Sequence, residues 1–300
     1  MIDPIAFKIG PLAIHWYGII IASAVLVAGV LGTAEAKRRR EDPEVGWSML
    51  MWALIGGVAG ARIYHVIHQW DFYSAHPDLI PQLWNGGLGI PGVIIGGVLA
   101  IAIYCRVKGL PAWRWLDIFA VSTLLGQVIG RLGNFVNQEL YGPPTDLPWG
   151  LTIDAAHRVG PWTDLLAYPV ETARFHPLFA YEALLNLMGV VVLLWIARRF
   201  AARLFDGDIL LLYLAWYGAV RTALESFRVE NWVVGGLPTA VWLGIAAVVG
   251  GLGFFLLRHA RGWGVPGAWM HREPPPEPTL DAPPADTPPP ADAPAEPSPG

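Results

Sequence analysis

Long runs of hydrophobic residues, separated by short polar segments, occupy most of the chain before residue 262. A helix that crosses a bilayer needs about 20 mostly apolar residues. Seven segments meet this requirement, at about residues 13–35, 47–68, 87–106, 114–134, 177–197, 208–226 and 237–257. The pattern therefore predicts an all-α, polytopic membrane protein with about seven transmembrane helices in one membrane-embedded domain, residues 1–262.

Basic residues between these segments fall mainly on one side of the predicted membrane. Thirteen of the 20 lysines and arginines follow the first, third, fifth and seventh spans, at positions 37–40, 106–114, 198–203 and 258–272. Cytoplasmic loops carry such an excess of Lys and Arg. We therefore expect the N-terminus outside and the C-terminus in the cytoplasm.

Two segments outside the spans have their own character. Residues 135–176 form a long connection on the outer side, and ordered loops of that length are usually functional. Residues 273–300 are rich in Pro and Ala and carry six acidic residues and no basic one, which predicts a disordered cytoplasmic tail. Without that tail, the formal net charge of −4 becomes about +2, so a nucleic acid partner is not expected.

Small residues recur at helical spacing in the second and third spans. Gly56 and Gly60, and likewise Gly92 and Gly96, have the G-x-x-x-G spacing that lets two helix backbones approach closely. The single cysteine, Cys105, excludes an intramolecular disulfide and a thiolate zinc cluster, and we interpret it as a small buried residue. The hydrophobic content of 54% leaves few polar groups in the spans, so each of them requires an explanation.

Three arginines lie in or at the edge of apolar spans: Arg62, Arg131 and Arg221. A charge near the bilayer centre costs about 2.5–3.5 kcal/mol on insertion scales, so such groups are expected to face the protein interior or a wet cavity. The guanidinium group binds phosphate in a two-pronged geometry. An intramembrane arginine therefore indicates, above other ligands, the phosphate of a lipid headgroup.

The sixth span places Tyr217, Arg221, Glu225 and Arg228 on one helix face, because their spacing is i, i+4, i+8 and i+11. A stripe of this kind is typical of a binding or catalytic surface. The structural alternative is an Arg221–Glu225 ion pair that only fixes helix packing.

A second polar face lies at the end of the fourth span. Arg131, Asn134 and Gln138 share it at i, i+3 and i+7, and Asn137 and Glu139 add an amide and a carboxylate. Gly142 ends this dense polar segment.

Two histidines begin helices on the same outer side. His15, with Trp16 and Tyr17, begins the first span, and His176 precedes the fifth. Each alone is typical of an interfacial anchor or helix boundary. Their convergence on one leaflet with the Arg131 segment indicates a shared site. No metal-binding or serine-nucleophile motif is present, so neither a metal nor a cofactor is expected.

Two other classes of protein remain open from the residues alone. Intramembrane Arg and Glu also mark ion and proton paths, so a transporter or channel is one alternative. It predicts inverted repeats, and the two halves of the sequence show no convincing match. A structural or lipid-binding membrane protein, with arginines paired but without chemistry, is the other.

Residues 130–142 read GRLGNFVNQELYG and resemble the signature of bacterial prolipoprotein diacylglyceryl transferases. The resemblance covers about residues 1–257 and extends to residues 15–18, 60–62, 84–88, 176–177, 181–182 and 217–221, with Glu225. It implies a multi-pass protein of the bacterial inner membrane that transfers the diacylglyceryl group of phosphatidylglycerol to the lipobox cysteine of prolipoprotein signal peptides. A thioether forms and glycerol phosphate leaves, which is the first step of lipoprotein maturation.

The resemblance also implies roles for individual residues. Arg131 and Arg221 match arginines needed for activity, and Glu139 and His176 are the further candidate catalytic residues. The expected substrate-binding residues are Arg131, Asn134, Asn137, Gly142, Tyr17, Arg62, Tyr217 and Glu225.

One departure concerns the proton acceptor. Many family members carry a histidine where this chain has Pro91, and that histidine is a candidate base. Here the base is instead expected to be Glu139, His176 or Tyr217, or the phosphate of the lipid or a neighbouring arginine takes its place.

Overall fold

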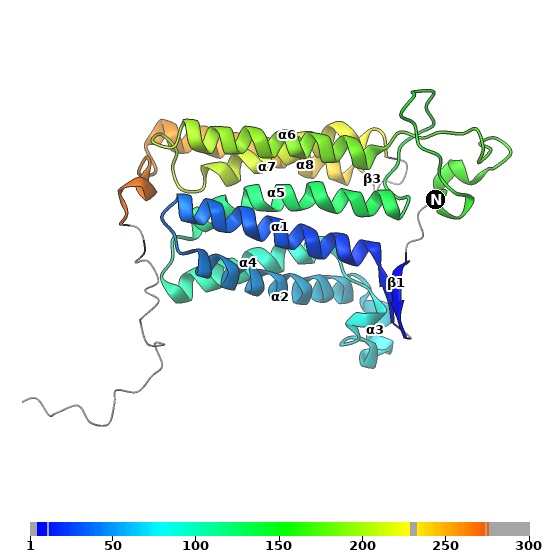
Figure 1. The fold of residues 1–300 in the computed structure, drawn as a ribbon, viewed down its shortest axis with the longest axis horizontal. Helices are drawn as coiled ribbons and strands as arrows, with labels where there is room; N and C mark the ends of the chain where they lie inside the picture. Colours follow the sequence, from blue (N-terminus) through cyan, green and yellow to red (C-terminus); the bar gives the residue numbers. More distant parts are fainter. Residues whose placement is uncertain (1–4, 11, 229–232, 274, 276–300) are drawn as a thin grey trace, which may run out of the picture.

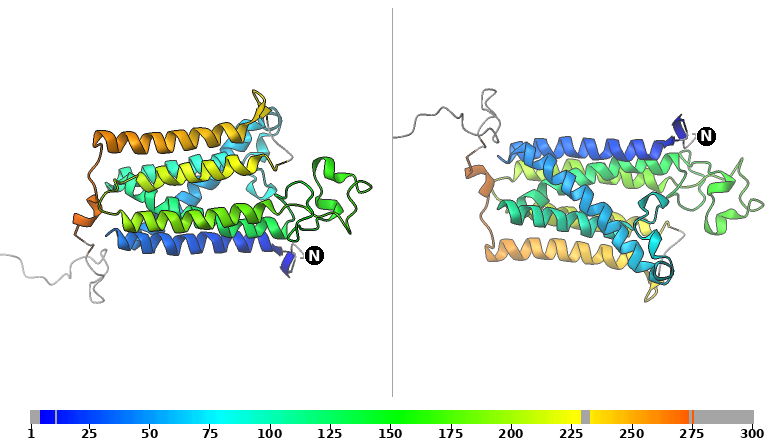
Figure 2. Two further views of the ribbon diagram at one scale, coloured as in Figure 1. Left: turned by 90° about the horizontal axis from the view of Figure 1, so that it is seen from above. Right: turned by 90° about the horizontal axis from the view of Figure 1, so that it is seen from below.

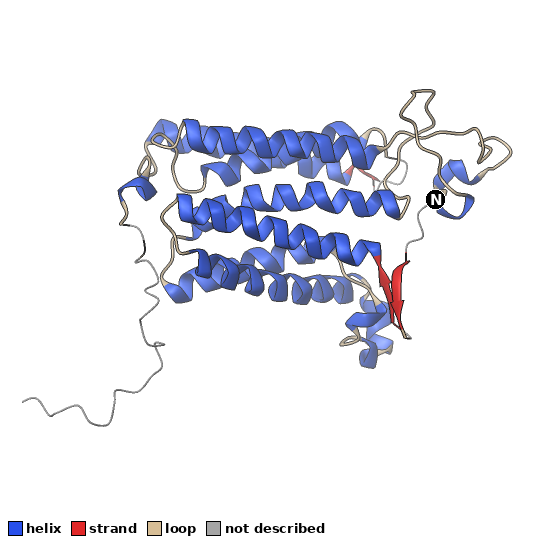
Figure 3. Ribbon diagram, viewed as in Figure 1, coloured by secondary structure: helices blue, strands red, loops and turns tan. Residues whose placement is uncertain are grey.

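Seven long helices form the body of the protein (Figures 1 and 3). The computed structural model describes residues 5–10, 12–228, 233–273 and 275, so the expected tail lies almost entirely outside the described residues. The long helices are α1 (Trp16–Arg38), α2 (Pro43–His68), α4 (Ile90–Lys108), α5 (Ala112–Val136), α6 (Leu178–Arg199), α7 (Asp208–Glu225) and α8 (Thr239–Arg261).

Six of these helices are long and apolar enough to cross a membrane. The exception is α7, which carries Asp208, Arg221 and Glu225 and packs against α5, α6 and α8. The helices lie where the hydrophobic pattern predicts them, within a few residues at each end. The prediction of an all-α polytopic membrane protein is therefore confirmed.

The two ends of the helix bundle differ in composition and structure. One end, at the left of Figure 1, carries the basic segments at residues 37–42, 106–114, 198–208 and 258–272; we call it the basic end. At the opposite end, which we call the loop end, the N-terminal hairpin and the long connection 137–177 project beyond the helices. Figure 2 shows the same separation from two further sides.

Short elements are concentrated at the loop end. Strands β1 (Ile5–Ile9) and β2 (Leu12–His15) form an antiparallel hairpin before α1, and β3 (Val233–Val234) and β4 (Leu237–Pro238) form a second one before α8. Helix α3 (Trp70–Ala75) follows α2. The 3-10 turns are η1 (Pro77–Leu79), η2 (Leu83–Asn85), η3 (Ala155–His157), η4 (Gly160–Thr163) and, at the basic end, η5 (Ala268–His271).

Helices α2 and α4 meet backbone to backbone. A Cβ atom on Gly60 would overlap the carbonyl oxygen of Gly92, and one on Gly56 would lie 2.7 Å from the carbonyl oxygen of Gly96. Only glycine fits at such distances, so the close packing predicted from the G-x-x-x-G spacing is confirmed.

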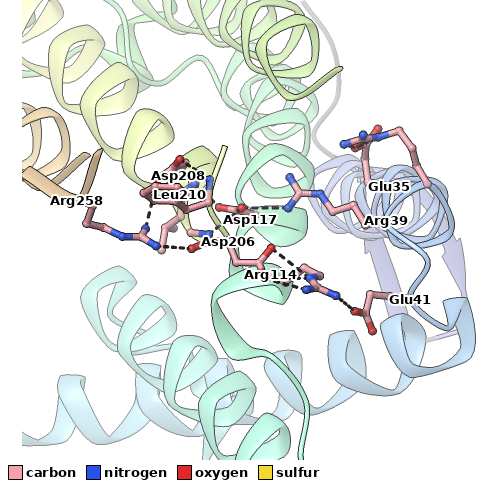
Figure 4. A network of polar contacts seen from close by, with 12 residues as sticks. Glu35, Arg39, Glu41, Arg114, Asp117, Asp206, Asp208, Leu210 and Arg258 are labelled. Carbon is pink, nitrogen blue, oxygen red and sulfur yellow. Dashed lines mark hydrogen bonds and ion pairs between the residues drawn. The ribbon is translucent and has the colours of Figure 1, made fainter. Parts of the chain in front are cut away.

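Buried ion pairs join the helix ends at the basic end (Figure 4). Asp117 on α5, which is 1% exposed, accepts hydrogen bonds from Arg39 Nη1 at 3.0 Å and from the backbone N–H groups of Gly207 and Leu210 at 2.9 and 2.8 Å. The other ion pairs join Arg114 to Glu41 and Asp206, and Arg258 to Asp208. We call these seven charged residues the basic-end network. It connects the segments around α1, α5, α7 and α8.

Candidate active site

At the loop end, the chain turns back on itself directly after α5. Gln138 and Leu140 adopt positive φ angles of 52° and 57°, a left-handed conformation that costs a non-glycine residue about 1–2 kcal/mol. The reversal brings the backbone N–H of Glu139 to 3.0 Å from the carbonyl oxygen of Asn134. Strained turns of this kind are found where a side chain must be held in one place.

The side chains of this turn form a continuous hydrogen-bonded series. Arg131 Nη1 donates to Asn134 Oδ1 at 3.1 Å, and Asn134 Nδ2 donates to Glu139 Oε1 at 2.8 Å. Asn137 Nδ2 donates to the same carboxylate oxygen at 3.3 Å. The structure thus brings together four of the residues expected at the site and orients the guanidinium of Arg131 through an amide.

Two buried carboxylates bring the arginines of three segments together. Arg131 pairs with Glu182 of α6, and Arg221 pairs with Glu225 one turn further along α7. Arg228, just beyond α7, lies 3.9 Å from each of the two carboxylates. We call these five residues the arginine cluster. The Arg221–Glu225 pair foreseen as the structural alternative does form, but within this larger group of charges.

The cluster holds three guanidinium groups against two carboxylates. Glu182 and Glu225 are 4% and 2% exposed, whereas the arginine side chains keep about a fifth of their surface accessible. Burial, and next the neighbouring Arg221, lowers the pKa of Arg228 from its ordinary value, which reflects the cost of gathering cations here. An anion that enters between the arginines relieves this repulsion and finds donors suited to phosphate.

Two of the tyrosines expected at the site lie in different places, Tyr17 against Gly133 and Tyr217 beside the cluster. The ring of Tyr17 from α1 packs on Gly133, where a Cβ would lie 2.7 Å from Tyr17 Cδ2. The phenol of Tyr217 lies close enough to Glu182, Arg131 and Arg221 to interact electrostatically with them. The ring of Tyr17 therefore fills the space beside Gly133 that a side chain would otherwise occupy.

His176 and Gly142 lie side by side at the start of α6. The N–H of Gly142 donates to the carbonyl oxygen of His176 at 2.8 Å. His176 Nδ1 lies 3.0 Å from the hydroxyl of Tyr181, which also accepts a hydrogen bond from Trp149 Nε1 at 2.8 Å. One imidazole nitrogen of His176 is therefore already engaged by a side chain that ties the long connection to α6.

Arg62 has different surroundings. It is 7% exposed and donates to the backbone carbonyl oxygens of Leu79, Ile80, Gly86 and Gly87, at 2.6 to 3.1 Å. Its guanidinium thus organises the segment between α3 and α4 and does not join the arginine cluster. Its expected contact with substrate stays a prediction.

Two members of the cluster are missing from the set of site residues expected from the sequence. Glu182 is a charged residue in an otherwise apolar span, which is the signal that could have identified it. Arg228 belongs to the polar stripe of the sixth span but lies beyond the helix end.

Comparison with known proteins decides the family. The family model for prolipoprotein diacylglyceryl transferase matches residues 4–257. The chain belongs to this family.

Curated relatives agree with that assignment. Proteins named phosphatidylglycerol–prolipoprotein diacylglyceryl transferase include one from Chloroflexus aggregans, 44% identical over 76% of this chain and 76% of its own length. Those from Nostoc sp. and Pediococcus pentosaceus are 40% and 36% identical, over 85% and 86% of this chain and 90% of each relative. The protein is accordingly a membrane-embedded transferase of lipoprotein biosynthesis.

Proposed function

We propose that this protein transfers the diacylglyceryl group of phosphatidylglycerol to the lipobox cysteine of prolipoproteins, at the loop end of its helix bundle. Family membership supports the reaction, and the arginine cluster is the observation that supports the location. The concentration of basic residues at the opposite end favours the cytoplasm for that end, by the positive-inside rule. The active site then faces the outer leaflet of the bacterial inner membrane.

Arg131 and Arg221 are the proposed phosphate ligands. Each is paired with a carboxylate in the structure, so a lipid phosphate must take the place of Glu182 and Glu225 in part of these contacts. Arg228 lies close enough to both carboxylates to share their charge while this exchange occurs. Asn134, Tyr17 and Tyr217 then line the same space as neutral donors.

The chemistry is a displacement at carbon. The cysteine sulfur forms a bond to the glyceryl carbon that carries the phosphate, and the bond from that carbon to the phosphate oxygen breaks. The electron pair leaves with the oxygen, so that a glycerol phosphate monoester departs with increased negative charge. Donors fixed around a developing charge typically contribute a factor of about 10²–10³ in rate each, and we assign this role to Arg131 and Arg221.

Glu139 is the proposed acceptor of the thiol proton. The residue is exposed, and the amides of Asn134 and Asn137 both bind Oε1, so Oε2 is the oxygen proposed to take the proton. His176 has one ring nitrogen engaged by Tyr181, and Pro91 in the first turn of α4 has no group that could take a proton. Of the candidates from the sequence, Glu139 has the most accessible basic atom.

A reconstituted assay tests the reaction. Purified protein in phosphatidylglycerol vesicles is incubated with a lipobox peptide, and the peptide is examined by mass spectrometry. We expect addition of one diacylglyceryl group to the cysteine and release of glycerol phosphate. A matched peptide with serine in place of cysteine should stay unmodified. An unmodified cysteine peptide would refute the proposed function.

A further inference from the structure

A cleft of about 440 Å³ with a mixed polar and apolar lining opens at the loop end, between the turn that follows α5 and the long connection. Its walls include Gln138, Glu139 and Tyr141 from the turn, Ala156 and His157 from η3, and Arg228 from the segment after α7. The volume lies within the range of about 300–1,000 Å³ that is typical of sites for small ligands. Glu139 and Arg228 at its edge have roles in the proposed reaction, whereas Gln138, Tyr141, Ala156 and His157 have none so far.

The cleft is held open by a rigid frame. The side-chain amide of Gln138 makes two hydrogen bonds to Asp154: Nε2 donates to Oδ2 at 2.7 Å, and Oε1 accepts from the backbone N–H at 2.9 Å. The hydroxyl of Tyr141 donates to the carbonyl oxygen of His157 at 3.0 Å and accepts from the N–H of Val159 at 2.7 Å. The two walls are therefore fixed to each other before any ligand arrives, which lowers the entropic cost of binding.

The cleft is continuous with the proposed reaction centre. Glu139 lines it and is hydrogen-bonded to Asn134, which in turn binds Arg131. Arg228 lines it and is also a member of the arginine cluster. A molecule whose reactive atom lies beside Glu139 can thus continue into the cleft.

The lining matches an extended peptide better than a lipid. It combines amide and carboxylate groups with the apolar sides of Leu140, Tyr141 and Val159, so it offers partners to peptide N–H and C=O groups without forming an apolar channel. Acyl chains are instead accommodated by the exposed apolar surface of the helices. Glycerol phosphate, with ten heavy atoms, is too small to fill the space.

We propose that this cleft binds the residues that follow the acceptor cysteine in the substrate peptide. The proposal rests on the proposed function, because it assigns a subsite to the second substrate of that reaction. The cysteine itself then lies beside Glu139, and the chain after it runs outward between the turn and η3. Peptides that extend beyond the cysteine gain binding energy that shorter peptides lack.

The experiment uses a bulky side chain to fill the cleft. Ala156→Trp places an indole in the cleft, whereas Ala155→Trp, at the neighbouring exposed position that does not line it, is the matched control. Each variant is assayed with saturating phosphatidylglycerol and two peptides, one that ends at an amidated cysteine and one that continues for several more residues. For Ala156→Trp we expect KM to rise about tenfold for the long peptide and to stay unchanged for the short one. Ala155→Trp should resemble the parent protein with both peptides.

A chemical variant avoids any effect on folding. Cys105 is buried, with 1% of its surface exposed, so the folded Ala156→Cys protein can be alkylated at the new position alone. Alkylation with a bulky maleimide, removed before the assay, should reproduce the selective loss for the long peptide. The long peptide with serine in place of cysteine has no thiol to consume the reagent, and when bound it should slow the alkylation.

The possible results separate the alternatives. An equal effect on both peptides, or the same effect from Ala155→Trp, would overturn the proposal. Unchanged peptide KM values with altered inhibition by glycerol phosphate would assign the cleft to product release instead. Failure of the parent protein to modify either peptide would refute the proposed function itself, which is a different outcome from loss of length dependence.

Discussion

The arginine cluster at the loop end and the basic-end network are built from the same functional groups, but their charges are satisfied differently. In the basic-end network, three arginines meet four carboxylates, and Arg272 and His259 are further partners of Glu41 and Asp208. Asp117 accepts hydrogen bonds from Arg39 and from two backbone N–H groups. In the arginine cluster, three guanidinium groups share two carboxylates. The cations of the first arrangement are thus matched by carboxylates, whereas the second has guanidinium donors in excess.

The comparison teaches that the number of partners, and not the presence of buried charge, separates a structural network from a binding site. A buried carboxylate that is fully hydrogen-bonded joins chain segments. The folded protein loses stability when one partner of such a carboxylate is removed. A guanidinium that is paired once and partly accessible can exchange its partner for phosphate. Substitutions in the basic-end network should therefore lower mainly the stability of the protein, whereas substitutions in the arginine cluster should lower mainly its activity.

The largest effect is expected from Asp117→Ala in the basic-end network. The change leaves Arg39 and two backbone N–H groups buried without their acceptor, at a cost of about 3–5 kcal/mol in the free energy of unfolding. Thermal unfolding in detergent, followed by circular dichroism, measures the loss. The fraction that remains folded should keep the activity of the parent protein. Stable but inactive protein would contradict the structural role.

Arg131→Ala and Arg221→Ala should instead lower activity more than stability. Each removes a donor to the leaving phosphate, so the turnover rate is expected to fall about 10²–10³-fold. Glu182 keeps Arg228 nearby in the Arg131 variant, so the melting temperature should fall less than in Asp117→Ala. Both quantities are measured on the same preparation. Activity within a factor of two of the parent would remove the arginine from the mechanism.

Glu139→Gln tests the proton acceptor. The amide keeps the shape of the side chain but cannot take the thiol proton, so activity at pH 7 should fall about 100-fold. A cysteine thiol with a pKa of about 8.5 ionises unaided as the pH rises. The deficit relative to the parent protein should therefore narrow at pH 9.5. A ratio that does not change with pH would exclude Glu139 as the base.

Glu182→Gln should have a smaller effect, and it should strengthen the binding of the lipid. Without the carboxylate, Arg131 and Arg228 no longer need to exchange an ion-pair partner for phosphate. We expect KM for phosphatidylglycerol to fall about fivefold, equivalent to about 1 kcal/mol. An increased KM would show that Glu182 positions the arginines and does not compete with the lipid.

Cys105→Ala should have the smallest effect. Cys105 is on α4 near the basic end, and its thiol lies in a cluster of buried residues from several helices. No proposed step takes place there. We expect unchanged turnover and a loss of about 1 kcal/mol in stability. Loss of activity in a folded variant would assign the cysteine a chemical role.

The parts of the fold that depend on local pattern could be predicted from the sequence. Apolar length located the seven long helices, and the G-x-x-x-G spacing located the contact between α2 and α4. The i, i+3 spacing of Arg131 and Asn134 predicted a shared face, and the two side chains are hydrogen-bonded.

Contacts between distant segments could not be predicted in the same way. Glu182 is 51 residues from Arg131, and their pairing depends on how α5 and α6 pack. The acceptors for Arg62 are backbone carbonyl oxygens, which every residue possesses, so no side-chain pattern identifies them. At the basic end, the arginines served to predict orientation, but their pairing with Asp117 and Asp208 follows from the assembled bundle.

The glycine contact between α2 and α4 has a mechanical consequence. Backbones that touch cannot slide or rotate past each other without collision, so the two helices form one rigid unit. Arg62 on α2 donates hydrogen bonds to the carbonyl groups of the segment that leads into α4, so this connecting segment moves together with the two helices. Helices α7 and α8 share a contact of the same kind at Gly218 and Gly244, so we expect hydrogen–deuterium exchange to be slow along both pairs and faster in α1 and α6. Helices α1 and α6 contact their neighbours through side chains, so α2 and α4 form a fixed frame against which these helices can move.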